Sequence, residues 1–357
     1  MTQSNRFNNL LRSDQSGAAL ILTLLIITVL VVLVLETLRA MQVEGAAARH
    51  FQDSIQAEAL AKSGVNVAIA LLVQDLEEDL KDGAPKQDIV DYPGEPWALV
   101  TDPDSIPTEL SKLGTLEGKV TDESGKFPIN HLVSGEEDAL QQNHREVLER
   151  LLINAPFLME QEDAKGLINA IKDWLDSDDE PTGELGAETD YYEILEQPYP
   201  CKNGPLTSLD ELLLIRGMGP ELYFGNEGSP GLKDLLTIYG EGSININTAE
   251  LLVLQALPNV AQDTALDWAE SVIAYREEPM HWDFLKESDW YRNRVAGFAD
   301  INLPAKLITL RSSHFSVQMT GKVGVGRKSV FAYLERQTSE DDKEPGVTVG
   351  VRFWQVY

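Results

Sequence analysis

The residues best suited to chemistry lie in one acidic stretch between positions 173 and 190. Its carboxylates are Asp173, Asp176, Asp178, Asp179, Glu180, Glu184, Glu188 and Asp190. Asp176 and Asp178 are close enough in sequence to share a hard cation, and Glu188 or Asp190 can complete the shell from across the loop. Calcium takes six to eight oxygen ligands, including carbonyls, and tolerates irregular loops. The stretch therefore predicts a calcium site with Asp176, Asp178, Glu188 and Asp190 as its candidate ligands.

A solvated acidic loop is the alternative interpretation, because the whole chain is acidic. It carries 58 Asp and Glu residues against 29 Lys and Arg residues, a formal net charge of −29. Such a charge disfavours sequence-independent binding to nucleic acid or anionic lipid and suits a divalent cation better. The stretch is not an EF-hand, because the sixth position counted from Asp176 is Pro181, where that loop requires glycine.

Catalytic signatures are weak, so we predict that the chain is not an enzyme. Its histidines are scattered and match no metalloprotease, nucleophile-elbow or phosphate-loop motif: His50, His131, His144, His281 and His314. Cys201 is the sole cysteine, has no paired base in the sequence and cannot form an internal disulfide. A membrane-anchored hydrolase with an unrecognised site is the remaining enzymatic alternative.

The N-terminal segment predicts a membrane anchor. Residues 1–17 are polar, and residues 18–35 carry no charge. At 1.5 Å per residue this apolar run spans about 27 Å, close to a hydrocarbon core of about 30 Å. Arg6 and Arg12 precede the run, which places the N-terminus in the cytoplasm. A cleaved secretory signal is the alternative, but the long run without a helix break disfavours it.

Helical periodicity continues beyond the apolar run. Apolar residues recur in steps of three and four up to Leu80, and no proline occurs between Ala18 and Ala84. An unbroken helix over residues 18–81 would be about 95 Å long. Gly45 and Gly64 are the positions at which it could bend. The pattern predicts an apolar stalk that carries a globular head.

The junction between Gly17 and Ala18, with the charged leader before it, resembles a type IV pilin-like leader. The resemblance implies that prepilin peptidase cleaves after Gly17 and that Ala18 becomes the new, methylated amino terminus. Most pilin-like subunits carry Glu at the fifth mature position, where this chain has Leu22. A carboxylate there would neutralise the terminal amine of a neighbouring subunit, since an unpaired charge in hydrocarbon is costly. A subunit with Leu22 suits the tip of a fibre, where nothing lies above it.

Several further motifs narrow the resemblance to the type II secretion minor pseudopilin K family. They are Gly118-Lys119-Val120, Gly125-Lys126-Phe127-Pro128-Ile129-Asn130, Asp173-Trp174-Leu175-Asp176-Ser177-Asp178, Gly186-Ala187-Glu188, Tyr191-Tyr192 and Ile244-Asn245-Ile246-Asn247-Thr248-Ala249. The resemblance implies an α+β fold: a type IV pilin-like long N-terminal helix plus an antiparallel sheet, with a large all-helical insertion containing helix-hairpin-helix or SAM-like modules. It also implies calcium binding near the acidic stretch.

The function implied by this resemblance is that of a minor pseudopilin at the tip of the type II secretion pseudopilus. There the subunit would initiate assembly and support export of folded proteins across the outer membrane. The implied partners are minor pseudopilins I and J, other pseudopilins and prepilin peptidase. The implied location is the inner membrane, with a cytoplasmic N-terminus and a periplasmic head.

The order of sequence patterns predicts five segments. They are a leader (1–17), a transmembrane helix (18–35), a stalk helix with the first strands (36–130), a helical insertion (131–303) and C-terminal strands (304–357). Residues 84–108 are expected to form a loop, and residues 116–130 a hairpin or a bent strand. Apolar alternation at Phe315, Val317 and Met319 predicts a half-buried strand. Further strands are expected around residues 330–334 and 347–353, separated by an acidic linker at 339–344.

Two stretches resemble helix-hairpin-helix modules, residues 209–220 and 246–276. In DNA-binding versions, a glycine-rich hairpin offers backbone N–H groups to phosphate. The first stretch has Gly217 and Gly219, but the second has no glycine in its hairpin, and neither is surrounded by Lys and Arg. We therefore favour structural modules and expect no nucleic acid; a membrane-tethered DNA-binding or DNA-uptake protein is the alternative. The tryptophans of this region are expected to fill a core: Trp174, Trp268, Trp282 and Trp290.

Overall fold

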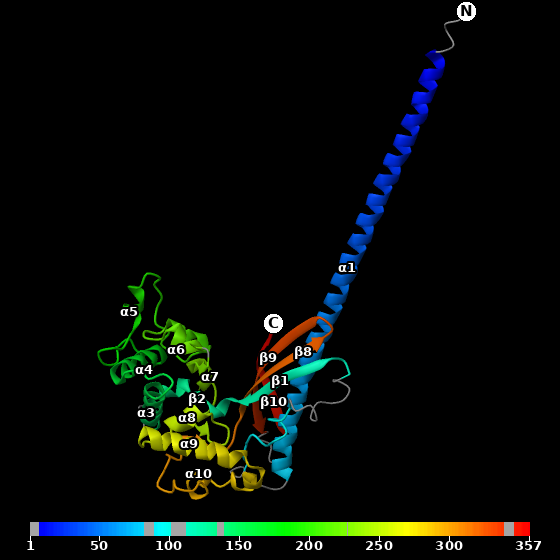
Figure 1. Ribbon diagram of the computed structural model, residues 1–357. Coiled ribbons are helices and arrows are strands. Elements are labelled where there is room, and N and C mark those ends of the chain that lie inside the picture. Colours follow the sequence, from blue (N-terminus) through cyan, green and yellow to red (C-terminus); the bar gives the residue numbers. More distant parts are fainter. Residues whose placement is uncertain (1–6, 82–88, 101–111, 134–138, 227, 339–345) are drawn as a thin grey trace, which may run out of the picture.

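One long helix dominates the computed structural model, which describes all residues except 1–6, 82–88, 101–111, 134–138, 227 and 339–345. Helix α1, Phe7–Lys81, projects from a two-part head (Figure 1). It is unbroken through Gly45 and Gly64, as predicted, and its 75 residues span about 110 Å. The helix begins within the predicted polar leader rather than at Ala18.

Helix α1 has a bare half and a packed half. Its side chains are exposed from Gly17 to beyond His50, and burial begins only with the turns that lie against the head. The buried positions recur in steps of three and four, so they form one apolar face: Ala57, Leu60, Ala61, Val65, Ala68, Leu72 and Leu76. The predicted stalk and head are confirmed by this division.

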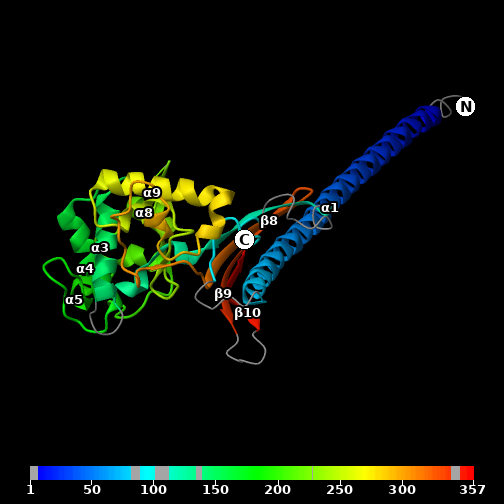
Figure 2. The ribbon, with the colours of Figure 1, turned by 90° about the horizontal axis from the view of Figure 1, so that it is seen from below.

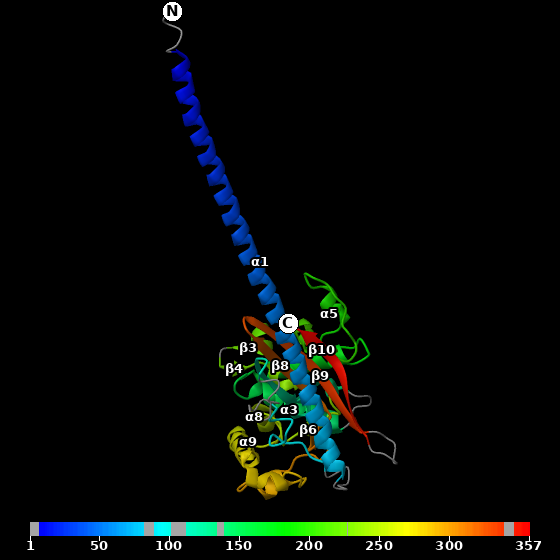
Figure 3. The ribbon, with the colours of Figure 1, turned by 90° about the vertical axis from the view of Figure 1, so that its right-hand side faces the viewer.

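A four-stranded antiparallel sheet packs on the head end of α1 (Figures 2 and 3). Its strand order is β1-β8-β9-β10, with bounds Thr115–Asp122, His314–Val323, Gly326–Thr338 and Val347–Val356. Phe315, Val317 and Met319 are fully buried against the helix, which confirms the predicted strand face. Helix and sheet share one hydrophobic core, as expected for two amphipathic elements that each bury one face.

The first strand of the sheet is far in sequence from the strand with which it pairs. Strand β1 pairs with β8, and Val120 lies opposite Val317. The hairpin that we considered for residues 116–130 is wrong, because β2 (Phe127–Pro128) pairs instead with β5 (Leu236–Thr237). The cause is local: Asp122 accepts a hydrogen bond from the Ser124 N–H and caps the 3₁₀ helix η2 (Glu123–Gly125), which turns the chain out of the sheet.

The remainder of the head is a mainly helical lobe, on the side of the sheet opposite α1 (Figures 1 and 2). Its α-helices are α3 (Ala139–Ile153), α4 (Gln161–Leu175), α5 (Thr189–Glu193), α6 (Pro220–Phe224), α7 (Leu232–Leu235), α8 (Leu251–Ala256), α9 (Gln262–Glu277) and α10 (Trp290–Asn293). Its 3₁₀ helices are η3 (Ile129–Leu132), η4 (Leu209–Leu214) and η5 (Pro279–Phe284). Short pairings of β3 (Gly225–Asn226) with β4 (Ser229–Pro230), and of β6 (Ile244–Asn245) with β7 (Ile308–Thr309), brace the loops.

The helical lobe has a hydrophobic core of its own, separate from the core under the sheet. Trp174, Trp268 and Trp290 are buried in it, which confirms the expected core role of these three residues. Trp282 is only partly buried and packs at the edge of this core. The predicted loop is confirmed over residues 89–100, which contain turns; the acidic linker lies outside the described residues. The limits of the five predicted segments remain predictions.

Candidate functional site

The acidic stretch folds as a loop between helices α4 and α5. Helix α4 ends at Leu175, and Asp176 follows as its C-cap, with its N–H bonded to the carbonyl of Lys172. Asp176, Asp178 and Glu188 come together, with one carboxylate oxygen of each within 4.8 Å of the others. Asp190 does not join this group; it lies exposed in the first turn of α5. Three of the four predicted ligands are thus neighbours in space.

A buried aspartate, Asp173, holds the loop in shape but is not one of the three grouped carboxylates. Asp173 accepts hydrogen bonds from the backbone N–H groups of Thr182, at 3.0 Å, and Ala187, at 2.7 Å. A side chain at Gly186 would place its Cβ only 2.3 Å from Asp173 Oδ2, so this position requires glycine. These contacts attach the middle and the far end of the loop to one carboxylate of α4, and so bring Glu188 back beside Asp176.

The carboxylates of this group are poorly compensated by the protein. Glu188 is 4% exposed, and among the described residues neither of its oxygens has a hydrogen-bond partner; the same holds for Asp176 Oδ1. Burial and the charges of Asp173 and Asp176 raise the pKa of Glu188 to about 7, which the neighbouring thiol of Cys201 opposes only in part. Burial and the charge of Asp178 raise the pKa of Asp176 to about 6. The group therefore favours the uptake of positive charge, either protons or a cation.

Asn203 is a further part of the loop that the sequence did not reveal. Its Nδ2 donates to the carbonyl of Asp178, at 2.9 Å, and to Asp179 Oδ1, at 3.0 Å. Its Oδ1 is buried without a hydrogen-bond partner among the described residues. Asn203 has a positive φ of 49°, a conformation that asparagine tolerates better than most residues. An Asn-Gly pair in a loop was the available signal, but nothing in the sequence connects it to Asp178.

The three carboxylates are better suited to binding a calcium ion than to remaining buried without one. Carboxylate oxygens are ligands that calcium prefers, and the three carboxylates would supply part of a shell of six to eight oxygens. Backbone carbonyls or water would complete it. The buried oxygens without donors support this fit, because an uncompensated buried carboxylate is unfavourable.

Cys201 lies beside this loop and is suited to packing rather than to nucleophilic attack. Burial raises the pKa of its thiol to about 12, so the thiol stays protonated at neutral pH. Its Sγ lies 3.6 Å from the carbonyl of Asp173. The thiol therefore helps to hold the end of α4 in place.

The predicted processing segment lies on the bare half of α1. Gly17, Ala18 and Leu22 are all exposed, and a Cβ added at Gly17 would meet no atom within 4 Å. Among the described residues, α1 is the one helix that is long and apolar enough to cross a membrane, and this part of it is unburied. A substitution at Gly17 would therefore leave the packing of the head unchanged.

In the two stretches that resemble helix-hairpin-helix modules, the arginines bond to groups within the protein. Arg216 donates to the carbonyl of Gly186 and lies over the ring of Tyr191. Arg276 is buried and donates to the carbonyls of Ile246 and Ala249. The first stretch forms a 3₁₀ helix followed by the five-residue helix α6, and the second forms helices α8 and α9. Neither arginine is presented to a phosphate backbone.

A long helix packed by one half on an antiparallel sheet is a pilin-like architecture, and the apolar bare half fits a single-pass membrane anchor. Comparison with known proteins then gives the family. Residues 125–224 match the family model described as type II secretion system (T2SS), protein K. Type II secretion system protein K of Pseudomonas aeruginosa is 30% identical over 252 residues, covering 69% of this chain and 69% of that protein. The chain belongs to the type II secretion system protein K family, as its sequence motifs predicted.

Further comparisons agree with this assignment. Type II secretion system protein K of Aeromonas hydrophila is 29% identical over 333 residues, covering 89% of this chain and 92% of that protein. A chain in the crystal structure of the GspK-GspI-GspJ complex of the enterotoxigenic Escherichia coli type 2 secretion system has the same fold. The TM-score is 0.63 at 17% identity, and the match covers 88% of this chain and 99% of that chain. The predicted α+β fold with a long N-terminal helix is thus confirmed.

Proposed function

We propose that this chain is a minor pseudopilin at the tip of the type II secretion pseudopilus, where it assembles with minor pseudopilins I and J. The observation that carries the proposal is the bare half of α1, because its apolar side chains pack on none of the other described residues and suit a bundle of other pseudopilin stalks. The solved relative that shares the fold is in a complex with GspI and GspJ. Assembly of this tip complex would initiate the pseudopilus and support export of folded proteins.

Two features support the tip rather than the shaft. Leu22 occupies the position at which a shaft subunit would offer a carboxylate to the terminal amine of a neighbour. The helical lobe stands beside the sheet and widens the head (Figure 1), so that a subunit stacked directly above would clash with it. Both features are compatible with a subunit above which nothing is added.

The proposal includes processing and location. Prepilin peptidase would cleave between Gly17 and Ala18 on the cytoplasmic side of the inner membrane, and the head would lie in the periplasm. We further propose a calcium ion at Asp176, Asp178 and Glu188 that stiffens the loop between α4 and α5, with Asp190 outside the first ligand set. The helix pairs at residues 209–220 and 246–276 would be structural modules of helix-hairpin-helix type.

The processing proposal is tested by replacing Gly17 with leucine and following both chain length and protein secretion. Gly45→Leu is the matched control, since Gly45 also lies on the exposed part of α1 with no atom within 4 Å of an added Cβ. We expect G17L to keep its full length and to abolish secretion, while G45L is processed normally. Normal processing and secretion of G17L would overturn the assignment.

The partner proposal is tested with the full-length chain in detergent. Co-purification with minor pseudopilins I and J is expected, and a stable complex with neither of them would contradict the tip position. A gel shift with DNA at several salt concentrations tests the membrane-tethered DNA-binding alternative, which requires an affinity that falls steeply with salt.

A further inference from the structure

A buried polar network joins the stalk helix to both parts of the head, and the guanidinium of Arg336 on β9 lies at its centre. The Arg336 side chain is 1% exposed. Its Nη1 donates to Asp75 of α1 at 2.8 Å, and its Nη2 donates to Asp91 and to the carbonyl of Ser312, the latter at 3.0 Å. Arg336 therefore connects α1, the segment of residues 89–100 and the segment that leads into β8.

The network continues from Asp91 into the helical lobe. The carbonyl of Asp91 accepts a hydrogen bond from Asn245 Nδ2 of β6 at 3.1 Å. Asn245 Nδ2 also donates to Asp122 Oδ2, at 3.0 Å, as does the hydroxyl of Thr248, at 2.5 Å. Ser312 closes the ring, because its N–H donates to Asp91 and its hydroxyl to Asp122. The chain leaves the sheet at Asp122 and returns at Ser312, so both crossings into the helical lobe are held by these bonds.

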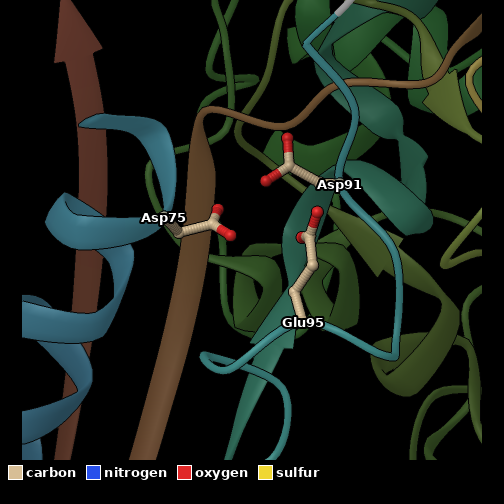
Figure 4. A group of neighbouring side chains, drawn as sticks. All are labelled: Asp75, Asp91 and Glu95. Carbon is tan, nitrogen blue, oxygen red and sulfur yellow. The ribbon is translucent and has the colours of Figure 1, made fainter. Parts of the chain in front are cut away.

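The stalk end of the network carries more negative than positive charge. Figure 4 shows Asp75, Asp91 and Glu95 pointing toward one another, and one oxygen of each lies within 4.8 Å of the others. Arg336 bonds Asp75 and Asp91. Glu95 instead accepts from Trp97 Nε1, at 2.6 Å, and from the N–H of Tyr92, at 3.2 Å. Three ionised carboxylates with one guanidinium would be strongly unfavourable in this buried position, so the cluster must take up a proton or a cation.

The surroundings favour a proton. Both oxygens of Asp91 already accept hydrogen bonds from protein donors, and the guanidinium of Arg336 already places a positive charge beside Asp75 and Asp91, which disfavours a second cation there. Burial and the charges of Asp91 and Asp75 raise the pKa of Glu95, and burial and the charge of Asp91 raise that of Asp75. The other charged or titratable groups around the cluster come from α1, residues 89–100, β1 and the helical lobe, and are mostly acidic: Glu78, Asp79, Tyr92, Asp122, Asp283 and Lys286.

We propose that Glu95 keeps its proton at neutral pH, and that loss of this proton loosens the junction between the stalk helix and the head. When Glu95 is neutral, the single guanidinium of Arg336 has to compensate only Asp75 and Asp91. The protonated carboxyl can also donate a hydrogen bond toward them. The ionised form adds a third negative charge beside α1, which pushes residues 89–100 away from the helix and weakens the path from Arg336 to Asn245. The orientation of the helical lobe on the stalk is thereby made dependent on protonation.

The test is Glu95→Gln in the full-length chain in detergent, with calcium chelated in all samples. The amide imitates the neutral acid and keeps an acceptor for Trp97. A carboxyl whose pKa is raised in the folded state makes that state bind more protons than the unfolded state, so stability falls as pH rises toward the raised pKa. We expect the Tm of the unsubstituted chain to fall from about pH 6 to about pH 9, and that of E95Q to fall by clearly less. Glu221→Gln, at an exposed position on α6, is the control and should follow the unsubstituted chain.

Hydrogen exchange locates the effect. At about pH 9, residues 89–100 and 244–249 should exchange faster in the unsubstituted chain than in E95Q, while strand β8 should not differ. Parallel Tm curves for the two proteins would overturn the proposal, as would failure of E95Q to fold at about pH 6, where the neutral isostere must be tolerated. In separate samples without chelator, a rise in Tm with added Mg²⁺ or Ca²⁺ that is lost in E95Q but retained in Glu188→Gln would also overturn it, because the cluster would then hold a cation.

Discussion

Calcium binding at the loop between α4 and α5 is expected to weaken steeply as the pH falls. Calcium requires ionised carboxylates, so protons compete with it at every ligand that titrates in the range used. Without calcium, Glu188 has a pKa of about 7 and Asp176 a pKa of about 6, both raised mainly by burial. Lowering the pH from about 8 to about 5 takes both groups from the ionised to the protonated form.

The magnitude follows from these two values. At about pH 5, roughly 1% of Glu188 and roughly 10% of Asp176 remain ionised, whereas at about pH 8 almost all of both are. If each must be ionised to bind, the calcium affinity falls on the order of 10³-fold over this range. In Glu188→Gln the affinity is lower at every pH, but its fall with pH is only on the order of tenfold, because Asp176 alone still competes.

The assay is calorimetric titration of the full-length chain with calcium at several pH values, with melting curves alongside. Asp190→Asn is the control, because Asp190 lies outside the group and should leave both affinity and pH dependence unchanged. The argument is refuted if calcium changes neither heat nor Tm, or if affinity does not depend on pH. Equal losses of affinity in D190N and E188Q would show that the wrong oxygens have been assigned.

Two stability predictions test the packing of the stalk on the sheet. Phe315→Ala should lower the free energy of unfolding by about 3–5 kcal/mol, because the ring is fully buried between α1 and the sheet. Val325→Ala, at an exposed turn, is the control and should change it by less than about 0.5 kcal/mol. Denaturant titration measures both values. Gly321→Ala should lower the free energy of unfolding by at least about 1–3 kcal/mol, because the new Cβ would lie 2.2 Å from the carbonyl oxygen of Ala57. Gly219→Ala is the control, since a Cβ there would meet no atom within 4 Å. An equal Tm for the two variants would contradict the close approach at Gly321.

The stalk and the strands could be predicted from the sequence because their signals are local. Spacing of three and four residues and the absence of proline are sufficient for α1. Alternation at Phe315, Val317 and Met319 is sufficient for one face of β8. The partner of β1 could not be predicted, because two short β-type runs around Ser124 fit a hairpin as well as they fit separate sheets. Only the cap at Asp122 and its contacts with distant residues decide between them.

In the candidate sites too, only residues that are close in sequence could be grouped before the structure was known. Asp176 and Asp178 could be paired from their spacing, and Glu188 from the loop that must return to them. Asn203 could not be placed, because its contact with Asp178 depends on how the loop after α5 folds. The Asp75–Asp91–Glu95 cluster has no sequence signature, because Asp75 lies on a different element from Asp91 and Glu95, and the shared partner of the two aspartates, Arg336, lies 245 residues beyond Asp91.

The position of β1 has a consequence for how this protein is made. Strand β1 lies on one side of the helical lobe in the sequence, and its partner β8 lies on the other, so the sheet cannot close until the whole lobe has been synthesised. The apolar face of α1 from Ala57 to Leu76 packs on β8 and β9, which are synthesised after the helical lobe. Until β8 and β9 are made, the apolar face of α1 is exposed in the nascent chain and prone to aggregation, whereas the helical lobe can already fold on its own core.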